Sequence, residues 1–214
     1  MKSMRRADAA ARLQHRMIMN TYPTGAVREL LKTDAVTPPT RQALERRYRT
    51  TAPAPKFFSA GQIALLRAAA ARLVPQNNRD EPVDLAAEID TRLAEGSGNG
   101  WRFAALPADD QTYTLGLRGL EESAVELHGA SFVMLAGEQQ DDVLRCVQAG
   151  SAPGETWRTL DAPRFFEELL ADLAEAYYAH PLAQEEIGYA GMADAPGWAR
   201  IRLDELEDRE PRSI

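Results

Sequence analysis

Cysteine, histidine and long apolar runs are scarce in this sequence. Its 214 residues include one cysteine, Cys146, so the chain alone can form neither an internal disulfide framework nor a metal centre of several thiolates. Cys146 lies in a helical pattern, which favours a small buried apolar role, with a bridge to a partner chain as the alternative. No window reaches the roughly 18–20 apolar residues that a membrane-spanning helix needs.

The motifs of common catalytic and nucleotide-binding sites are also missing. The sequence contains no G-x-G-x-x-G, no G-x-x-x-x-G-K-[ST] and no G-x-S-x-G. Two acidic pairs, Asp109-Asp110 and Asp141-Asp142, consist of adjacent residues. Adjacent side chains on a helix diverge by about 100°, so neither pair converges on one proton or metal. We expect both pairs to favour helix N-termini through the helix dipole.

The three histidines, His15, His128 and His180, lie in separate segments. Neither His128 nor His180 has a partner at E-x-x-H or H-x-x-x-H spacing, which argues against a metal site built by this chain. His180 precedes Pro181, and the residue before proline is disfavoured in a helix. We expect His180 to fix the helix exit by hydrogen bonding, with a general base as the alternative.

Apolar residues make up 44% of the chain and charged residues 27%, which is ordinary for a globular protein. Helix signals dominate. Thr37 is a candidate N-cap with Pro38 at the first helical position, and Ser59 with Gln62 forms a capping box for a helix that Pro75 closes. The segment 131–135 is too short for its pattern to distinguish a strand from a helix.

Four further helices are predicted from apolar residues that recur every three or four positions, and Gly96, Gly129 and Gly150 are expected to end the first three. In the last helix, Glu168, Asp172 and Glu175 are expected on the solvent side. The predicted apolar positions are Leu85, Ile89 and Leu93; Tyr113, Leu117, Leu120, Ala124 and Leu127; Val143, Leu144 and Val147; and Phe165, Phe166, Leu169, Leu170, Leu173, Ala176 and Tyr177.

The sequence thus predicts an all-α protein with four parts. Residues 1–50 form a basic helical N-terminal arm, 51–56 a proline-rich linker, 57–201 a single helical domain and 202–214 an acidic tail. The arm has 11 Lys or Arg against 4 Asp or Glu, whereas the whole chain carries a net charge of −7. Because its basic residues recur at helical spacing without glycine or aromatic interleaving, we expect it to lie on an acidic surface of this chain or a partner, not on nucleic acid.

The N-terminal segment contains the pair Arg5-Arg6, as twin-arginine export signals do. Such a signal also requires an apolar region, and Arg12, His15 and Arg16 interrupt the residues that follow. We therefore expect no cleavable signal peptide and a cytoplasmic location.

The stretch "YYAHPLAQEEIGYAGMADAPGW", residues 177–198, alternates aromatic side chains with helix-breaking residues. Pro181 is expected to end the preceding helix, and the glycines permit backbone conformations closed to other residues. Tyr189, Met192 and Trp198 offer large apolar areas that must be packed. This segment, the C-terminal clasp, is expected to fold back over the helices of its own domain, to anchor a protein partner, or to do both.

The order "FF…LL…YYAHP…IGYAG…PGW", preceded by "FVMLAGEQQDDVLRCVQAG" and "FFSAGQIALLRAAAARLVP", resembles the gluconate 2-dehydrogenase subunit 3 family. The resemblance spans about residues 57–201. Its most specific positions are His180-Pro181, Gly188-Tyr189, Gly191 and Gly197-Trp198.

The resemblance implies an all-α small (gamma) subunit without catalytic, cofactor-binding or metal-binding residues of its own. It would stabilise, mature or activate a large FAD-containing subunit of the glucose–methanol–choline type, which oxidises sugars, sugar acids or other alcohols and passes electrons to a separate cytochrome. The candidate partner-interface residues are His180, Pro181, Tyr189, Met192, Trp198 and Trp101.

Two features depart from the family pattern. A charged extension replaces the usual twin-arginine signal, so a periplasmic location through an exported partner is the alternative to the cytoplasm. The sequence "AQEEIGYAG" stands where relatives have "GGN" after the His-Pro. Two other functions remain open: a stand-alone helical adaptor or chaperone, and an enzyme that uses His180 with Glu185 or Glu186.

Overall fold

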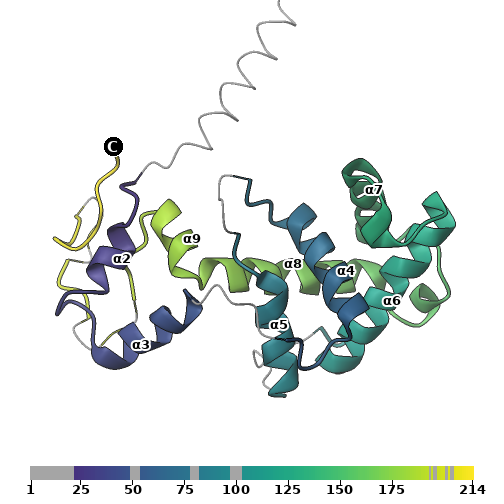
Figure 1. Cartoon of the computed structure of the whole chain (residues 1–214), viewed down its shortest axis with the longest axis horizontal. Helices are drawn as coiled ribbons and strands as arrows, with labels where there is room; N and C mark the ends of the chain where they lie inside the picture. The colour runs from purple at the N-terminus through teal and green to yellow at the C-terminus, as the bar shows by residue number, and fades with distance from the viewer. Residues whose placement is uncertain are drawn as a thin grey trace, which may run out of the picture. The chain divides into compact units, whose positions relative to one another are not determined.

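The computed structural model describes most of the chain from Tyr22 to Ile214, and every regular element in that part is helical. The all-α prediction is therefore confirmed for it. The described residues fall into two compact units, which are considered separately (Figure 1). The helical core unit contains residues 54–177, and the clasp unit combines residues 22–48 with those from Tyr178 onward. The described residues are 22–48, 54–77, 82–96, 103–192, 194, 197–200, 202 and 205–214.

Residues 57–201 are predicted as one domain, whereas in the structure the part from Tyr178 onward forms a compact unit with the N-terminal arm. None of the helices in the described part of the chain has the length and apolar character needed to cross a membrane.

The helical core unit begins with α4, Ala60–Leu73, whose capping box is confirmed. The Ser59 hydroxyl accepts a hydrogen bond from the Gln62 backbone N–H at 3.3 Å, and the Gln62 side-chain oxygen accepts one from the Ser59 N–H at 3.0 Å. Both contacts satisfy N–H groups that a helix start would otherwise leave unpaired. The helix ends just before Pro75, as the sequence predicts.

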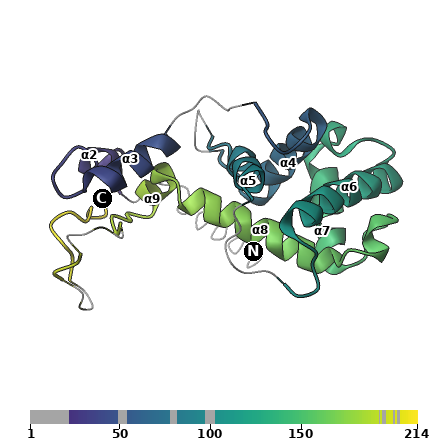
Figure 2. The same ribbon diagram turned by 90° about the horizontal axis from the view of Figure 1, so that it is seen from below.

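Four longer elements complete this unit: α5, Leu85–Ala94; α6, Asp109–His128; α7, Gly137–Ala149; and α8, Ala162–Tyr178. The 131–135 segment forms a short 3-10 helix, η1, Phe132–Met134, and a second one, η2, spans Thr156–Arg158. Helix α4 packs against α5, α6 and α7, and α6 lies beside α7 (Figure 2). Gly129 ends α6 with a φ of 73°, a left-handed conformation that confirms its predicted role as a stop.

Most predicted apolar positions are buried, but Leu127 and Leu170 are each 38% exposed. The larger errors concern Glu168 and Asp172, which we expected on the solvent side. They are 4% and 5% exposed, whereas Glu175 is exposed as predicted. Helix α8 is covered beyond its apolar stripe, because side chains from α5 and α6 reach over its acidic side.

Close helix packing depends on two glycines of α6. A Cβ atom at Gly116 would lie 2.0 Å from the Phe165 ring of α8, and one at Gly119 would lie 2.5 Å from the Trp157 ring of η2. No side chain fits in either place, so these glycines allow the two aromatic rings to rest directly on the α6 backbone.

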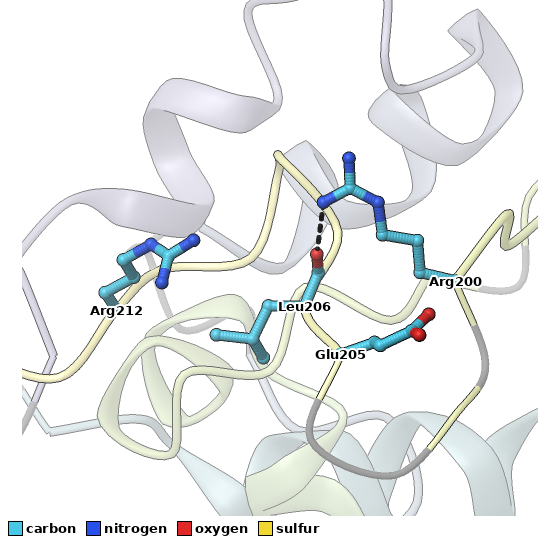
Figure 3. A pocket seen from close by; sticks show the side chains of 4 residues that line it. All are labelled: Arg200, Glu205, Leu206 and Arg212. Atoms are coloured by element: carbon cyan, nitrogen blue, oxygen red, sulfur yellow. Dashed lines mark hydrogen bonds between the residues drawn. The ribbon is translucent and has the colours of Figure 1, made fainter.

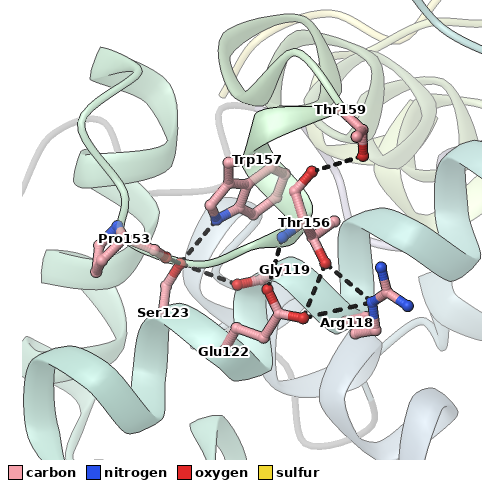
Figure 4. Close-up of polar contacts among 8 residues, drawn as sticks. All are labelled: Arg118, Gly119, Glu122, Ser123, Pro153, Thr156, Trp157 and Thr159. Atoms are coloured by element: carbon pink, nitrogen blue, oxygen red, sulfur yellow. Dashed lines mark hydrogen bonds and ion pairs between the residues drawn. The ribbon is translucent and has the colours of Figure 1, made fainter.

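A polar network holds η2 against α6 beside this contact (Figure 4). The Trp157 indole N–H donates to the Ser123 hydroxyl at 2.8 Å, and that hydroxyl lies 2.6 Å from the carbonyl oxygen of Pro153. The Glu122 carboxylate accepts from the Thr156 backbone N–H at 2.8 Å and from its hydroxyl at 2.9 Å. These bonds satisfy the polar groups that packing removes from water.

The two acidic pairs behave differently from each other. Asp109 and Asp110 occupy the first turn of α6, as predicted. Asp141 and Asp142 lie past the first turn of α7, so their predicted dipole role is wrong. Asp141 instead binds the Arg72 guanidinium of α4 through contacts of 2.7 and 2.6 Å.

Asp142 lies 3.2 Å from the His128 ring at the end of α6, so α7 is linked to two neighbouring helices through its adjacent acids. Cys146, expected to be buried, is half-buried.

In the clasp unit the chain forms α2, Ala26–Leu30, then α3, Pro38–Arg47, and finally α9, Pro181–Glu186. Thr37 precedes α3 in the extended conformation expected of an N-cap. Pro181 was expected to end the preceding helix. Instead α8 ends at Tyr178, and Pro181 begins α9, because proline suits the first helical position, where its missing N–H costs no hydrogen bond.

Candidate functional site

The C-terminal clasp packs against the N-terminal arm. Its most extensive polar contact is made by Glu185, which is 6% exposed. One carboxylate oxygen accepts from the Gly25 backbone N–H at 3.3 Å, and the other accepts from the Arg28 backbone N–H at 3.1 Å. The Arg28 guanidinium completes a two-pronged ion pair at 3.2 and 3.1 Å. The hydrogen bond to this carboxylate raises the pKa of Arg28, so the guanidinium stays charged.

A second contact joins the arm to the end of the clasp. The Thr37 backbone N–H donates to one Asp194 carboxylate oxygen at 2.6 Å, and the Thr37 hydroxyl donates to the other at 2.5 Å. This carboxylate lies where α3 starts, which is the favourable end of the helix dipole for a negative charge.

His180 is 6% exposed and both of its ring nitrogens have partners. Its Nδ1 accepts from the Leu182 backbone N–H at 3.2 Å, which caps α9, and its Nε2 lies 2.6 Å from the Arg47 carbonyl oxygen. A neutral ring with its proton on Nε2 satisfies both contacts. The Tyr48 ring packs edge-on at 5.6 Å. His180 therefore has the hydrogen-bonding role predicted for it.

The candidate partner-interface residues separate into two groups. His180, Pro181 and Met192 are buried against their own chain, Met192 within an apolar cluster that contains Val27, Leu31, Val36 and Leu44. Tyr189 and Trp198 are 47% and 37% exposed. Trp101 lies outside the described residues. Only the two exposed aromatics among those described present substantial surface for another protein.

The rings of Tyr189 and Trp198 both lie close to Gly191. A Cβ atom at Gly191 would be 2.6 Å from the Tyr189 ring and 2.9 Å from the Trp198 ring. The Tyr189 hydroxyl donates to the Gly191 carbonyl oxygen at 2.5 Å. The Arg209 guanidinium stacks over the Trp198 ring at 4.4 Å. Ile187, 49% exposed, lies two residues before Tyr189. We call Ile187, Tyr189 and Trp198 the aromatic surface.

A hollow of about 440 Å³ lies in the C-terminal segment, and its described lining consists of Arg200, Glu205, Leu206 and Arg212 (Figure 3). The Arg200 guanidinium donates to the Leu206 carbonyl oxygen at 2.8 Å. The described lining thus combines two arginines, one glutamate and one leucine.

The helical core unit has a groove of about 490 Å³ between α4, α6 and η1, which sequence analysis missed. Leu65, Leu117 and Val133 line it, and the neighbouring Met134 is 77% exposed. The sequence contains one hint of this groove, the apolar segment 131–135. Its local pattern does not indicate that Val133 and Met134 are exposed at the surface.

Titratable groups meet inside the same unit. The Tyr113 hydroxyl donates to Asp172 at 2.5 Å, and Asp172 also binds Arg92 of α5. The second carboxylate oxygen of Glu168 is buried without a hydrogen-bond partner. Burial raises the pKa of both carboxyls, and the charge of Asp172 raises that of Glu168 further. These groups come from α5, α6 and α8.

Among the described residues, no group of three or more His, Cys, Asp or Glu side chains is arranged to hold a metal ion. Searches of curated proteins and of solved structures found no match. A family model described as gluconate 2-dehydrogenase subunit 3 matches residues 60–197, well over half of the chain, and includes the aromatic clasp except for Trp198. The chain therefore belongs to the gluconate 2-dehydrogenase subunit 3 family.

Proposed function

We propose that this chain is the non-catalytic small subunit of a dehydrogenase or oxidase complex. It stabilises, matures or activates a large FAD-dependent subunit of the glucose–methanol–choline type that oxidises sugars or other alcohols. Family membership supports a role as a dehydrogenase subunit. The observation that carries the proposal is the exposed aromatic pair Tyr189 and Trp198, whose rings both lie close to Gly191.

Tyr, Trp and Arg are the residue types most often found at the energetic centre of protein interfaces. The aromatic surface contains a Tyr and a Trp, and Arg209 stacks on the latter. The Tyr189 hydroxyl is already bonded to the Gly191 carbonyl, so its ring has little freedom left to lose on binding. Such preorganisation favours affinity, because a partner does not have to order the side chains it contacts.

The proposal places the flavin in the partner, since this chain has no phosphate-binding glycine motif. A separate cytochrome that accepts the electrons is proposed as a further partner. We propose a cytoplasmic location for the chain, with the periplasm as the alternative if the complex is exported.

The alternative in which His180 and Glu185 form a catalytic pair has less support. The His180 nitrogens bond to Leu182 and Arg47, and the Glu185 carboxylate bonds to the arm. His180→Ala in a complex that folds normally would leave turnover intact under the subunit proposal and abolish it under the enzyme alternative.

The proposal is tested by producing a large FAD-dependent subunit of the proposed type with and without this chain. We expect the large subunit alone to be poorly soluble, deficient in FAD or poorly active, and co-production to restore all three properties. A large subunit that is soluble, loaded with FAD and fully active by itself would refute the proposal. Restored solubility without a lasting complex would favour the stand-alone chaperone.

A further inference from the structure

The clasp unit has a core that its C-terminal part does not build by itself. Its buried apolar cluster consists of Val27, Leu31, Val36, Leu44 and Met192, so four of its five members come from the N-terminal arm. The family match begins at residue 60, which leaves the arm outside it, whereas Met192 lies inside. The part of the clasp inside the family match therefore supplies one residue, Met192, to this core, and the N-terminal arm, outside the match, supplies the other four.

The buried acid of the clasp depends on the same segment. The Glu185 carboxylate binds the backbone N–H groups of Gly25 and Arg28 and the Arg28 guanidinium. Without the arm, a carboxylate that is 6% exposed would lose these donors. Leaving a buried charge unpaired is strongly unfavourable, so replacement of the arm by a merely apolar surface is disfavoured.

The arm also contacts the turn that leads to the aromatic surface. Gly188 has a φ of 65°, and a Cβ atom there would lie 2.5 Å from the Tyr22 ring. The turn is closed by the Tyr189 N–H, which donates to the Gln184 carbonyl oxygen at 2.8 Å. Tyr22 thus packs directly against the backbone that precedes Tyr189.

We propose that residues 22–48 act as an intramolecular clamp, which occupies a docking face on the family's C-terminal segment and holds the aromatic surface ready for the large subunit. The occupant of this face is the chain's own arm. The contacts at Glu185, Met192 and Asp194 are made by three different residues of the clasp and all reach the same arm. The role in large-subunit binding rests on the proposed function, whereas clamping itself is a property of this chain alone.

The clamp is tested by placing a specific protease site within residues 51–53 of the full chain and cleaving it. Size-exclusion chromatography at decreasing concentrations then measures how tightly the arm stays bound. We expect the cleaved wild type to elute with its arm and Glu185→Gln to bind the arm at least tenfold more weakly. The amide supplies one acceptor oxygen where the carboxylate supplies two, and its NH2 group faces N–H donors.

The matched control is Glu29→Gln, which removes a carboxylate from α2, the helix that contains Arg28. Glu29 forms an exposed ion pair with Lys32, so we expect arm retention equal to that of the wild type. Release of the wild-type arm on cleavage, or equal retention by Glu185→Gln and wild type, would overturn the clamp.

Hydrogen exchange on the uncut chain provides a test that does not depend on cleavage. In Glu185→Gln we expect the Gly25 and Arg28 amides to exchange at least tenfold faster, with amides of α6 unchanged as the folding control. Unchanged Gly25 and Arg28 exchange would contradict the clamp. If the arm is retained but the flavoprotein does not bind, the clamp is supported and the proposed function is rejected. If the flavoprotein binds but the arm is not retained, the proposed function is supported and the clamp is rejected.

Discussion

The Tyr113 hydroxyl donates a 2.5 Å hydrogen bond to Asp172, and both side chains are buried between α6 and α8. Arg92 from α5 binds the same carboxylate, and Asp109 lies 3.5 Å from that guanidinium. Glu168, one turn before Asp172, has a buried oxygen without a hydrogen-bond partner. In this cluster three carboxyl groups, those of Asp109, Glu168 and Asp172, lie near one arginine, Arg92. The excess of carboxyl groups makes the stability of the protein depend on pH.

Glu168→Gln is expected to stabilise the protein at pH 7. Burial, then the charges of Asp172 and Asp109, raise the pKa of Glu168 in the folded state. The folded protein therefore binds the Glu168 proton more tightly than the unfolded chain does. The stability that this proton contributes to the folded state is fully present below the unfolded pKa of about 4.3 and is lost as pH rises through the folded pKa. Glutamine resembles the protonated acid and avoids that loss.

Denaturant unfolding of wild type and Glu168→Gln from pH 3.5 to 8 measures this effect. The gain should be largest at neutral pH and shrink below about pH 4. Glu167→Gln, on the exposed side of the same helix, is the control and should change stability by less than about 0.5 kcal/mol. A pH-independent difference for Glu168→Gln would show that its ionisation does not govern stability.

Asp90→Asn is expected to destabilise the helical core unit by about 2 kcal/mol at pH 7. The Asp90 carboxylate accepts hydrogen bonds from the backbone N–H groups of Lys56, Phe57 and Phe58 at 2.7, 3.0 and 2.8 Å. Burial acts to raise the pKa of Asp90, but these three donors outweigh it and hold the pKa below its ordinary value.

Because the Asp90 pKa is depressed on folding, its contribution is present above the unfolded pKa of about 3.9 and is lost as pH falls through the folded pKa. The difference between wild type and Asp90→Asn should therefore diminish in acid, when unfolding is followed by circular dichroism. Glu88→Gln, on the exposed face of the same helix, should match the wild type at every pH. An equal loss at pH 7 and in strong acid would point to packing instead of charge.

Gly119→Ala is expected to destabilise the protein by about 1–3 kcal/mol, although alanine is the better helix former. Its Cβ would lie 2.5 Å from the Trp157 ring, which a hydrogen bond to Ser123 holds in place. Gly61→Ala in α4 is the matched control, because nothing lies within 4 Å of its Cβ position. It should stabilise the protein by about 0.5–1 kcal/mol. Equal effects in thermal unfolding would contradict the close helix packing.

Tyr189→Ala and Trp198→Ala are each expected to weaken binding to the large flavoprotein subunit tenfold or more, which corresponds to about 1.4 kcal/mol. Both side chains are exposed, so the free chain should keep its helical content and melting temperature. Ile214→Ala, at a position 86% exposed at the C-terminus, should bind like the wild type. A double variant with unchanged affinity in calorimetry would place the interface elsewhere.

Local signals predicted the elements of the fold well. The capping box of Ser59 and Gln62, the proline after Thr37 and the stop at Gly129 each act through backbone atoms a few residues away, so a short window contains their cause. Glu168 and Asp172 were misplaced because helical periodicity identifies an apolar stripe but not how far neighbouring helices extend over its edges. Arg92, which binds and helps to cover Asp172, lies 80 residues before it in the sequence, so no short window contains both residues.

The candidate site was predicted only in part. The sequence identified the clasp and its aromatics, and it predicted the hydrogen-bonding role of His180. It did not indicate that Met192 packs against the arm, because its partners in the apolar cluster lie more than 100 residues away in the sequence. It also predicted that the basic arm lies on an acidic surface, and the Arg28–Glu185 pair shows one such contact within the chain.

The central claim is that this chain is the small subunit of a flavoprotein complex. It is tested most directly by purifying the tagged full chain after co-production with the proposed large flavoprotein subunit and recording the absorption spectrum across the size-exclusion peak. We predict one peak that contains both chains and a flavin spectrum in proportion to the large subunit. A colourless peak that contains this chain alone, beside a separate, active and flavin-loaded large subunit, would contradict the claim.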